Sequence, residues 1–232
     1  GTDTVTDVES FVFTDGTRAL AAMQNHAPTS FVLSGGSVDE TAAAGAVVGT
    51  LVAIDGDAND ILSYSLLSDP SGKFEVAGAQ IRLEAGAGLD FETAASHTLL
   101  VGVTDQSGGA LTTFVMVSIG NINEAPVGLL PASVLVAENA APSGVIATLS
   151  AVDPDAGGSH GFAIAGGAGV PFEIVGSDLR LAAGASLDFE TNDHYDVPVV
   201  VTDQDGLSIE AMILVGVTNV NETPVEAGSV TD

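Results

Sequence analysis

The stretch Asn121-Ile122-Asn123-Glu124-Ala125-Pro126 sets the organisation of this chain. It returns, slightly altered, as Asn219-Val220-Asn221-Glu222-Thr223-Pro224, and a shorter form, Asn25-His26-Ala27-Pro28, stands near the start. The prolines that close the three stretches are separated by 98 residues in each step. A fixed interval of this kind indicates an internal repeat, with the quoted stretches as linkers between its copies.

Acidic and amide residues repeat at the same interval of 98, and the alignment of the two copies needs no insertion. A repeat near 100 residues is too long for a solenoid unit, so each copy is expected to be a domain. The predicted domains cover 27–124 and 125–222, after a hairpin or linker over 1–26 and before a linker tail over 223–232. The repeated pairs are Glu40 and Glu138, Asp55 and Asp153, Asp57 and Asp155, Asp90 and Asp188, Glu92 and Glu190, Asp105 and Asp203, Asn121 and Asn219, Asn123 and Asn221, and Glu124 and Glu222.

Short strand-like runs separated by turns fill each copy, and no window shows a sustained helical period. Alternation of apolar residues is clear at Leu99, Val101 and Val103, as expected for a strand with one buried face. About seven strands in a domain of this size predict an all-β fold of two tandem seven-stranded Greek-key β-sandwiches. The expected strands of the first copy are Val47–Ile54, Ile61–Leu67, Gln80–Leu83, His97–Val103 and Leu111–Ile119.

The composition is strongly acidic, with 31 Asp and Glu against four Lys and Arg and a net charge of −27. This charge repels nucleic acid and anionic membrane surfaces. A hydrophobic content of 46% argues against disorder, so a salt-adapted surface or bound cations would have to accommodate the charge. Cysteine is absent, and the apolar stretch around 42–54 is too short and interrupted to span a bilayer. We therefore expect no direct insertion of this segment into a membrane.

The carboxylates at i and i+2 point to the same side of an extended chain, so Asp55 with Asp57 and Asp90 with Glu92 each aim two charges at one place. Such pairs repel unless a cation neutralises them. Calcium takes six to eight oxygen ligands from carboxylates, carbonyls and water, and Asn123 and its neighbours supply amide and backbone oxygens. Zinc would require His or Cys, which the repeated set lacks. The alternative is that these aspartates are ordinary turn residues.

Seven motifs in order resemble the cadherin repeat, in the variant common in large bacterial surface proteins. The resemblance covers about 29–126 and 127–224 and implies calcium between successive domains. The motifs are Val38-x-Glu40, 47–57 with Asp55-Gly56-Asp57, Tyr64-Ser-Leu, Phe74-Glu-Val, Leu89-Asp-Phe-Glu92, Leu99–Asp105 and the linker 121–126. Residues 1–17 also resemble the closing hairpin of repeats-in-toxin calcium modules, with Asp15-Gly16 as its turn.

The resemblance assigns the repeated residues to three calcium sites. Glu40, Asp90, Glu92, Asn121, Asn123, Glu124, Asp153, Asp155 and Asp203 would form the middle site. Asp55, Asp57 and Asp105 would serve a site before residue 27, and Glu138, Asp188, Glu190, Asn219, Asn221 and Glu222 a site after the second domain. The family linker usually reads Asp-x-Asn-Asp-Asn-x-Pro, so Asn121 and Glu124 are departures that favour one or two ions over three. His26 stands where Glu124 stands, which predicts a weaker first site.

The resemblance implies a non-enzymatic, secreted segment of an extracellular bacterial adhesin or surface protein, rigidified by calcium. Its expected partners are neighbouring repeats of the same parent chain and a homophilic or cell-surface adhesion partner. The alternatives are a glycan- or protein-binding β-sandwich module appended to a secreted enzyme, and an acidic spacer without ions. Catalysis is disfavoured because the Asp90 and Glu92 pair occurs on one segment in both copies, whereas glycosidase carboxylates flank a bond. His97, His160 and His194 do not repeat and are expected to be surface residues.

Overall fold

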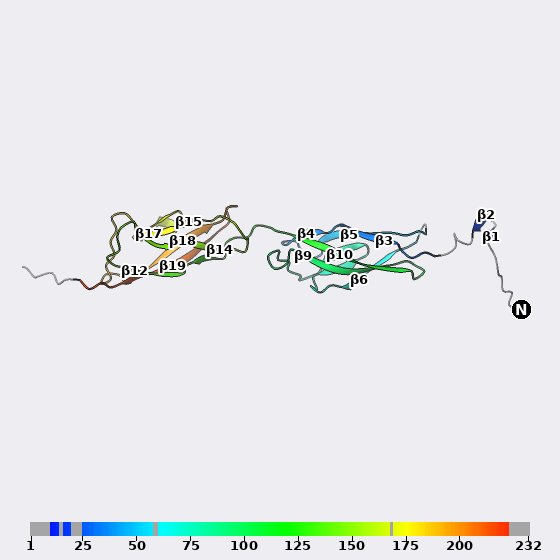
Figure 1. Ribbon diagram of the computed structural model, residues 1–232, viewed down its shortest axis with the longest axis horizontal. Helices are drawn as coiled ribbons and strands as arrows, with labels where there is room; N and C mark the ends of the chain where they lie inside the picture. The colour runs from blue at the N-terminus through cyan, green and yellow to red at the C-terminus, as the bar shows by residue number, and fades with distance from the viewer. Residues whose placement is uncertain (1–9, 14–15, 20–24, 58–59, 168, 223–232) are drawn as a thin grey trace, which may run out of the picture. The chain divides into compact units, whose positions relative to one another are not determined.

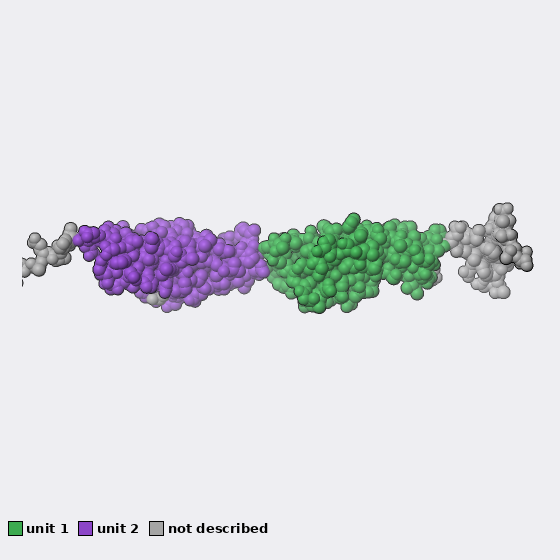
Figure 2. Space-filling model, turned by 90° about the horizontal axis from the view of Figure 1, so that it is seen from below, with its two compact units in different colours: residues 1–122 green, residues 123–232 purple. Residues whose placement is uncertain are grey.

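Strands supply nearly all regular structure in this protein, which divides into two units, residues 1–122 and 123–232 (Figure 2). The computed structural model describes residues 10–13, 16–19, 25–57, 60–167 and 169–222. Within those residues the one helical element is the 3-10 segment η2 (Ala165–Gly167). The all-β class predicted from the sequence is therefore confirmed.

The first pair of strands precedes the first sandwich in the sequence. Strands β1 (Ser10–Phe13) and β2 (Gly16–Ala19) pair antiparallel, with Phe13 opposite Gly16. The expected turn residue Asp15 and the residues before Ser10 lie outside the described part of the chain. The likeness to a repeats-in-toxin module stays a prediction.

Two four-stranded sheets form the sandwich of unit 1 (Figure 1). One sheet has the order β3-β5-β8-β7 and the other β4-β10-β9-β6. All neighbouring strands are antiparallel except β4 and β10, which are parallel. The strands are β3 (Ser30–Gly35), β4 (Ser37–Asp39), β5 (Val47–Ile54), β6 (Ser63–Ser68), β7 (Phe74–Ala77), β8 (Gln80–Leu83), β9 (Ser96–Thr104) and β10 (Ala110–Gly120).

The first strand of the unit 1 sandwich is broken into β3 and β4. The sandwich therefore has eight strands, where the sequence suggested about seven. Gly35 and Gly36 have φ values of 95° and 84°, a region that favours glycine, and they let the chain step from one sheet to the other. At Gly49, on the neighbouring β5, an added Cβ would lie 2.7 Å from the Ser34 carbonyl oxygen. The step between sheets therefore depends on glycine at this close approach.

Unit 2 repeats this plan with more interruptions. Its sheets have the orders β12-β19-β18-β15, β13-β17-β16 and β11-β14, and β12 runs parallel to β19. The first strand breaks at Pro131, which follows a cis peptide bond, and the copy of β5 is divided into β13 and β14. The strands are β11 (Gly128–Leu130), β12 (Ser133–Ala137), β13 (Val145–Thr148), β14 (Ser150–Val152), β15 (Gly161–Ile164), β16 (Phe172–Val175), β17 (Asp178–Leu181), β18 (His194–Thr202) and β19 (Ser208–Thr218).

Each unit has its own hydrophobic core, built from the inward faces of its strands. Leu99, Val101 and Val103 on β9 are fully buried, as the alternation predicts, and their copies Val197, Val199 and Val201 are fully buried as well. Burial of alternate side chains between two sheets is the basis of a sandwich. The strand ends then present loops at two opposite ends of each unit, and the repeated acidic residues lie in those loops.

No helical segment in the described part of the chain combines the length and the apolar character that a membrane crossing requires.

Candidate metal centres

The C-terminal end of unit 1, where β4 and β10 finish, gathers three of the predicted ligands. Glu40, Asp90 and Glu92 each offer a carboxylate oxygen, and these oxygens lie within 4.8 Å of one another. Glu40 is 9% exposed and accepts two backbone hydrogen bonds, from Phe91 N to Oε2 and from Ile122 N to Oε1, each 2.7 Å. Glu40 thus ties the loop before β9 to the end of β10.

Asp90 is oriented by the residue three positions later. Thr93 N donates to Asp90 Oδ1 at 2.7 Å, and Thr93 Oγ1 donates to Oδ2 at 2.9 Å. Both bonds lower the pKa of Asp90 below its usual value, and the bond from the Thr93 backbone has the larger effect. Asn121, the linker residue predicted for this site, is exposed directly after β10.

The C-terminal end of unit 2 reproduces this arrangement at the copied positions. Glu138, Asp188 and Glu190 offer oxygens within 4.8 Å of one another. Glu138 is 7% exposed and accepts from Phe189 N at 2.9 Å and from Val220 N. Every backbone contact of Glu40 therefore has its counterpart here.

The linker residues of unit 2 approach its acidic cluster. Asn219 Nδ2 donates to Glu190 Oε1 at 2.5 Å, whereas Asn221 is exposed. The negative charge of Glu190 is the largest cause of the raised pKa of Glu222. The charge of Glu138, burial and the charge of Asp188 raise it further. This shift records how densely carboxylates gather at this end.

At the N-terminal end of unit 1, Asp105 is held by the turn between β9 and β10. Ser107 N and Gly109 N donate to Asp105 Oδ1 at 2.8 and 2.9 Å, and Asn25 Nδ2 donates to Oδ2 at 2.9 Å. The Asn25 bond is the largest cause of the lowered pKa of Asp105, against the opposing effect of burial. Asp105 is 4% exposed, so its charge is held almost wholly by these donors.

The two aspartates after β5 are also tied to the linker. Asp57 N donates to Asp55 Oδ1 at 2.9 Å, and His26 N donates to Asp57 Oδ2 at 2.5 Å. The His26 backbone bond is the largest cause of the lowered pKa of Asp57. The His26 ring also lies beside this carboxylate, with Nδ1 3.2 Å from Asp57 Oδ1.

Unit 2 repeats these N-terminal contacts. Asn123 Nδ2 donates to Asp203 Oδ2 at 2.9 Å, and this bond is the largest cause of the lowered pKa of Asp203. Glu124 N donates to Asp155 Oδ2 at 2.7 Å, and Asp155 N donates to Asp153 Oδ1 at 2.9 Å. The linker before each sandwich is therefore bonded to two aspartates of the same unit.

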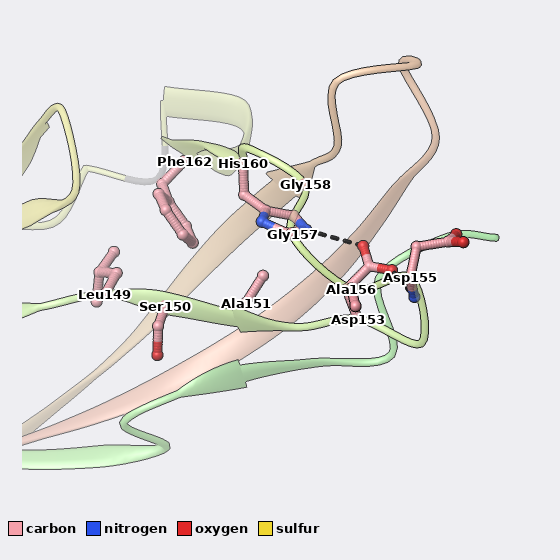
Figure 3. A pocket seen from close by; sticks show the side chains of 10 residues that line it. All are labelled: Leu149, Ser150, Ala151, Asp153, Asp155, Ala156, Gly157, Gly158, His160 and Phe162. Atoms are coloured by element: carbon pink, nitrogen blue, oxygen red, sulfur yellow. Dashed lines mark hydrogen bonds and ion pairs between the residues drawn. The ribbon is translucent and has the colours of Figure 1, made fainter. Parts of the chain in front are cut away.

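His160 departs from the sequence expectation of a surface residue. Its Nε2 lies 2.8 Å from Asp153 Oδ2, and the two side chains are 15% and 6% exposed. Figure 3 shows the His160 ring turned toward Asp153 at the rim of an open pocket of about 420 Å³, while Asp155 points away from the pair. The expectation was wrong because it rested only on the absence of a histidine at the corresponding position of the other copy. His194 is 56% exposed and contacts Asp193, and His97 stacks edge-on against Phe74.

Asp60 is a candidate ligand that the repeat pattern does not reveal. The oxygens within 4.8 Å of one another at the N-terminal end of unit 1 belong to Asp55, Asp60 and Asp105, rather than to Asp57. The position 98 residues after Asp60 is Gly158, so a search for repeated carboxylates omits Asp60. The available signal was its place beside the Asp55 and Asp57 pair, directly before the apolar run of β6.

The Cadherin domain family model matches residues 35–120 and 132–218. The chain belongs to the cadherin family. Its relatives include Cadherin-1 of Gallus gallus, 32% identical over 220 residues, covering 82% of this chain and 25% of that protein. Protein dachsous of Drosophila melanogaster is 31% identical over 199 residues, covering 80% of this chain and 6% of that protein. This cadherin chain thus spans a quarter or less of these two relatives.

Solved cadherin structures share the fold. A crystal structure of human protocadherin-24 EC1-2 has a TM-score of 0.64 at 24% identity, covering 85% of this chain and all of that chain. A crystal structure of mouse cadherin-23 EC22-24 has a TM-score of 0.64 at 23% identity, covering 85% of this chain and 68% of that chain. At these identities the likeness supports the β-sandwich fold alone.

Basic side chains take little part in the acidic clusters of this cadherin. In the described residues, Lys73 Nζ donates to the Gly88 carbonyl, Arg82 donates to Gln80, and Arg180 pairs with Asp178 at 2.9 Å. Backbone and amide N–H groups therefore carry most of the charge compensation at the four unit ends.

The side chains at these ends fit a hard cation. Asp55 Oδ2 and Asp60 Oδ2 are buried and have no hydrogen-bond partner. A buried carboxylate oxygen without a partner is costly, and such a group in a native protein calls for an ion or water. The atoms that these side chains offer to a metal are carboxylate and amide oxygens, which are the ligands that calcium prefers.

Proposed function

We propose that this chain is a calcium-binding, non-catalytic segment of an extracellular protein, in which bound ions stiffen a row of tandem cadherin domains. The parent protein is proposed to be a bacterial adhesin or surface protein, on the resemblance of the motifs to that variant of the repeat. Adhesion, with neighbouring repeats of the parent chain and a homophilic or cell-surface partner, is part of the proposal and is supported by membership of the cadherin family.

The proposal rests on two hydrogen-bond networks, one at each end of a unit, that both units repeat. Glu40 and Glu138 accept the same two backbone bonds, and Asp105 and Asp203 accept the same turn bonds and the same linker amide. The network presents the carboxylate groups in a fixed orientation while they repel one another. Two copies that hold carboxylates together against this repulsion favour a shared cation, because no Lys or Arg in the described residues forms an ion pair with these carboxylates.

The order of ligands along the chain supports a role at the joints. Asn121 follows the last strand of one domain, and Asn123 donates to Asp203 of the next domain, with Ile122 alone between the two asparagines. We propose that Glu40, Asp90, Glu92 and Asn121 act with Asn123, Glu124, Asp153, Asp155 and Asp203 on ions that restrain this joint. Glu138, Asp188, Glu190, Asn219, Asn221 and Glu222 would act at the following joint.

Calcium binding is tested by calorimetric titration of the chain with calcium. The wild-type chain is expected to bind, and the Asp155→Ala variant is expected to release less heat and bind more weakly. Glu210→Ala removes an exposed carboxylate of β19 and is the matched control, expected to behave as wild type. Negligible heat from the wild-type chain would sink the proposal.

Stiffening is tested by small-angle X-ray scattering with calcium and with a chelator. Because ions would link residues on both sides of the linker, calcium is expected to narrow the distribution of interdomain distances. The Asp90→Asn/Glu92→Gln variant should scatter in calcium much as wild type does in chelator. Identical wild-type profiles in both buffers would contradict the proposed role.

A further inference from the structure

Two separate loops meet at the N-terminal end of unit 1. Asp55 and Asp60 lie in the loop between β5 and β6, and Asp105 begins the turn between β9 and β10. One carboxylate oxygen from each lies within 4.8 Å of the other two. All three residues belong to the same unit, so this grouping requires no second domain.

Each of the two loop aspartates uses one oxygen for orientation and leaves the other free. Asp55 Oδ1 accepts from Asp57 N at 2.9 Å, and Asp60 Oδ1 accepts from Gln106 Nε2 at 3.0 Å. Asp55 Oδ2 and Asp60 Oδ2 are buried and have no hydrogen-bond partner among the described residues. A buried carboxylate oxygen almost always has a partner in a folded protein, so these two atoms call for one. A cation satisfies both oxygens and also offsets the repulsion between the neighbouring carboxylates, which a water molecule would leave in place.

We propose that Asp60 is a calcium ligand particular to unit 1, which with Asp55 and Asp105 forms a cation site contained in this single domain. The inference rests on the proposed calcium-binding function and adds a residue that the repeat does not contain. Gln106 is the positioning residue, since its amide holds Asp60 Oδ1 and leaves Asp60 Oδ2 available to an ion. Asp60 raises the carboxylate charge at an end whose linker carries His26 in place of Glu124.

The corresponding loop of unit 2 lacks this third aspartate and has a histidine contact instead. Gly158 replaces Asp60, and Asp153 Oδ2, the copy of the free Asp55 Oδ2, is contacted by His160 Nε2 at 2.8 Å (Figure 3). The residue of unit 1 that corresponds to His160 is Leu62, which cannot make such a bond. The oxygen that is free for an ion in unit 1 is therefore engaged in unit 2. Charge count and ligand number set calcium affinity, so the two N-terminal ends should differ in affinity.

The test measures calcium binding to the whole chain by calorimetry and by native mass spectrometry. Asp60→Asn keeps the side-chain shape and removes the charge. It is expected to weaken one class of site by at least about 10-fold, the lower end of the range for losing a group that only supports a metal ligand. At limiting calcium the variant should carry one ion fewer per chain. Asp196→Asn removes an exposed charge of β18 and should bind as wild type.

The melting temperature gives a second readout that separates binding from folding. Without calcium, Asp60→Asn should melt no lower than wild type, because the substitution relieves repulsion between carboxylates. With calcium, its rise in melting temperature should be smaller than that of wild type. A wild-type chain that binds calcium beside an Asp60→Asn variant with the same affinity, ion count and melting shift overturns the role of Asp60 and leaves the proposed function standing. A wild-type chain that binds no calcium overturns both.

A reciprocal substitution tests why the units differ. Gly158→Asp/His160→Leu gives the loop of unit 2 the residues of unit 1, and there is room for it, since the nearest atom to an added Cβ at Gly158 is His160 Cε1 at 3.8 Å. The double variant should gain affinity or carry a further ion. A binding curve unchanged from wild type would contradict the assignment of the difference to these residues.

Discussion

The C-terminal ends of the two units are closer copies of each other than the N-terminal ends are. At the C-terminal ends, Glu40 and Glu138 each accept hydrogen bonds from two backbone N–H groups, and the donors in the two units stand at corresponding positions. At the N-terminal ends the linker bonds repeat, but Asp60 in unit 1 gives way to a histidine contact in unit 2. Carboxylates anchored beside strand ends are therefore retained between the copies, whereas the loop after β5 retains two of its aspartates and has Gly158 in place of Asp60.

The largest effect is expected at the buried glutamates. Glu40→Ala and Glu138→Ala should each cost the affected unit about 3 kcal/mol of unfolding free energy in chelator, because each removes two hydrogen bonds to a charged acceptor. Chemical denaturation of the two variants measures this loss. Glu92→Ala, an exposed carboxylate of the same cluster, is the control and should cost little without calcium.

Equal losses in the two glutamate variants would support the equivalence of the C-terminal ends. A difference of more than about 1 kcal/mol, the worth of one ordinary hydrogen bond, would show that the ends are not equivalent.

A smaller effect, confined to unit 1, is expected at Asp69 in the turn before β7. Burial opposes ionisation of this carboxyl, but hydrogen bonds from Ser71, Phe74 and Lys73 outweigh it and lower the pKa of Asp69. Unit 2 has Gly167 at the copied position. Asp69→Asn should therefore lower the stability of unit 1 by about 1 kcal/mol at neutral pH.

The sign of the pH dependence follows from the lowered pKa. Ionised Asp69 stabilises the folded state above the unfolded value, about pH 3.9, and this contribution is lost as the pH falls through the folded pKa. The difference between wild type and Asp69→Asn should thus shrink toward zero on acidification. Denaturation curves at several pH values measure it, and a difference that grows in acid would contradict the lowered pKa.

The smallest effect is expected at the threonines that orient Asp90 and Asp188. Thr93→Val and Thr191→Val each remove one exposed hydroxyl bond and keep the backbone bond, so each should cost about 0.5 kcal/mol. Thermal melts in chelator detect a change of this size. Loss in one unit without the other would weaken the claim that the C-terminal ends are true copies.

The sequence predicted the fold class because a sandwich imposes a periodicity that can be read locally. Leu99, Val101 and Val103 alternate in the sequence and are fully buried, and the strands expected at Val47–Ile54 and Gln80–Leu83 have those bounds in the structure. The broken first strand was not predicted, because pairing of β4 with β10 joins residues about 80 positions apart. Gly35 and Gly36 mark the break only once both sheets are known.

The candidate sites divide in the same way. The repeat pointed to Glu40, Asp90 and Glu92, whose oxygens do come together, and their role as ligands stays a prediction. It could not point to Asp60, since a residue that occurs in one copy leaves no mark at the repeat interval.

By itself, the sequence determined that this chain holds two β-domains and which carboxylates recur at a fixed interval, because hydrophobic burial and duplication both leave regular spacing. The tertiary structure alone decided that Asp60 meets Asp105 and that His160 meets Asp153. Those contacts depend on how the loops between strands pack at one end of a sandwich. No sequence pattern encodes these contacts, because the Asp60 contact joins two loops far apart in the chain and the His160 contact depends on how a single loop folds back on itself.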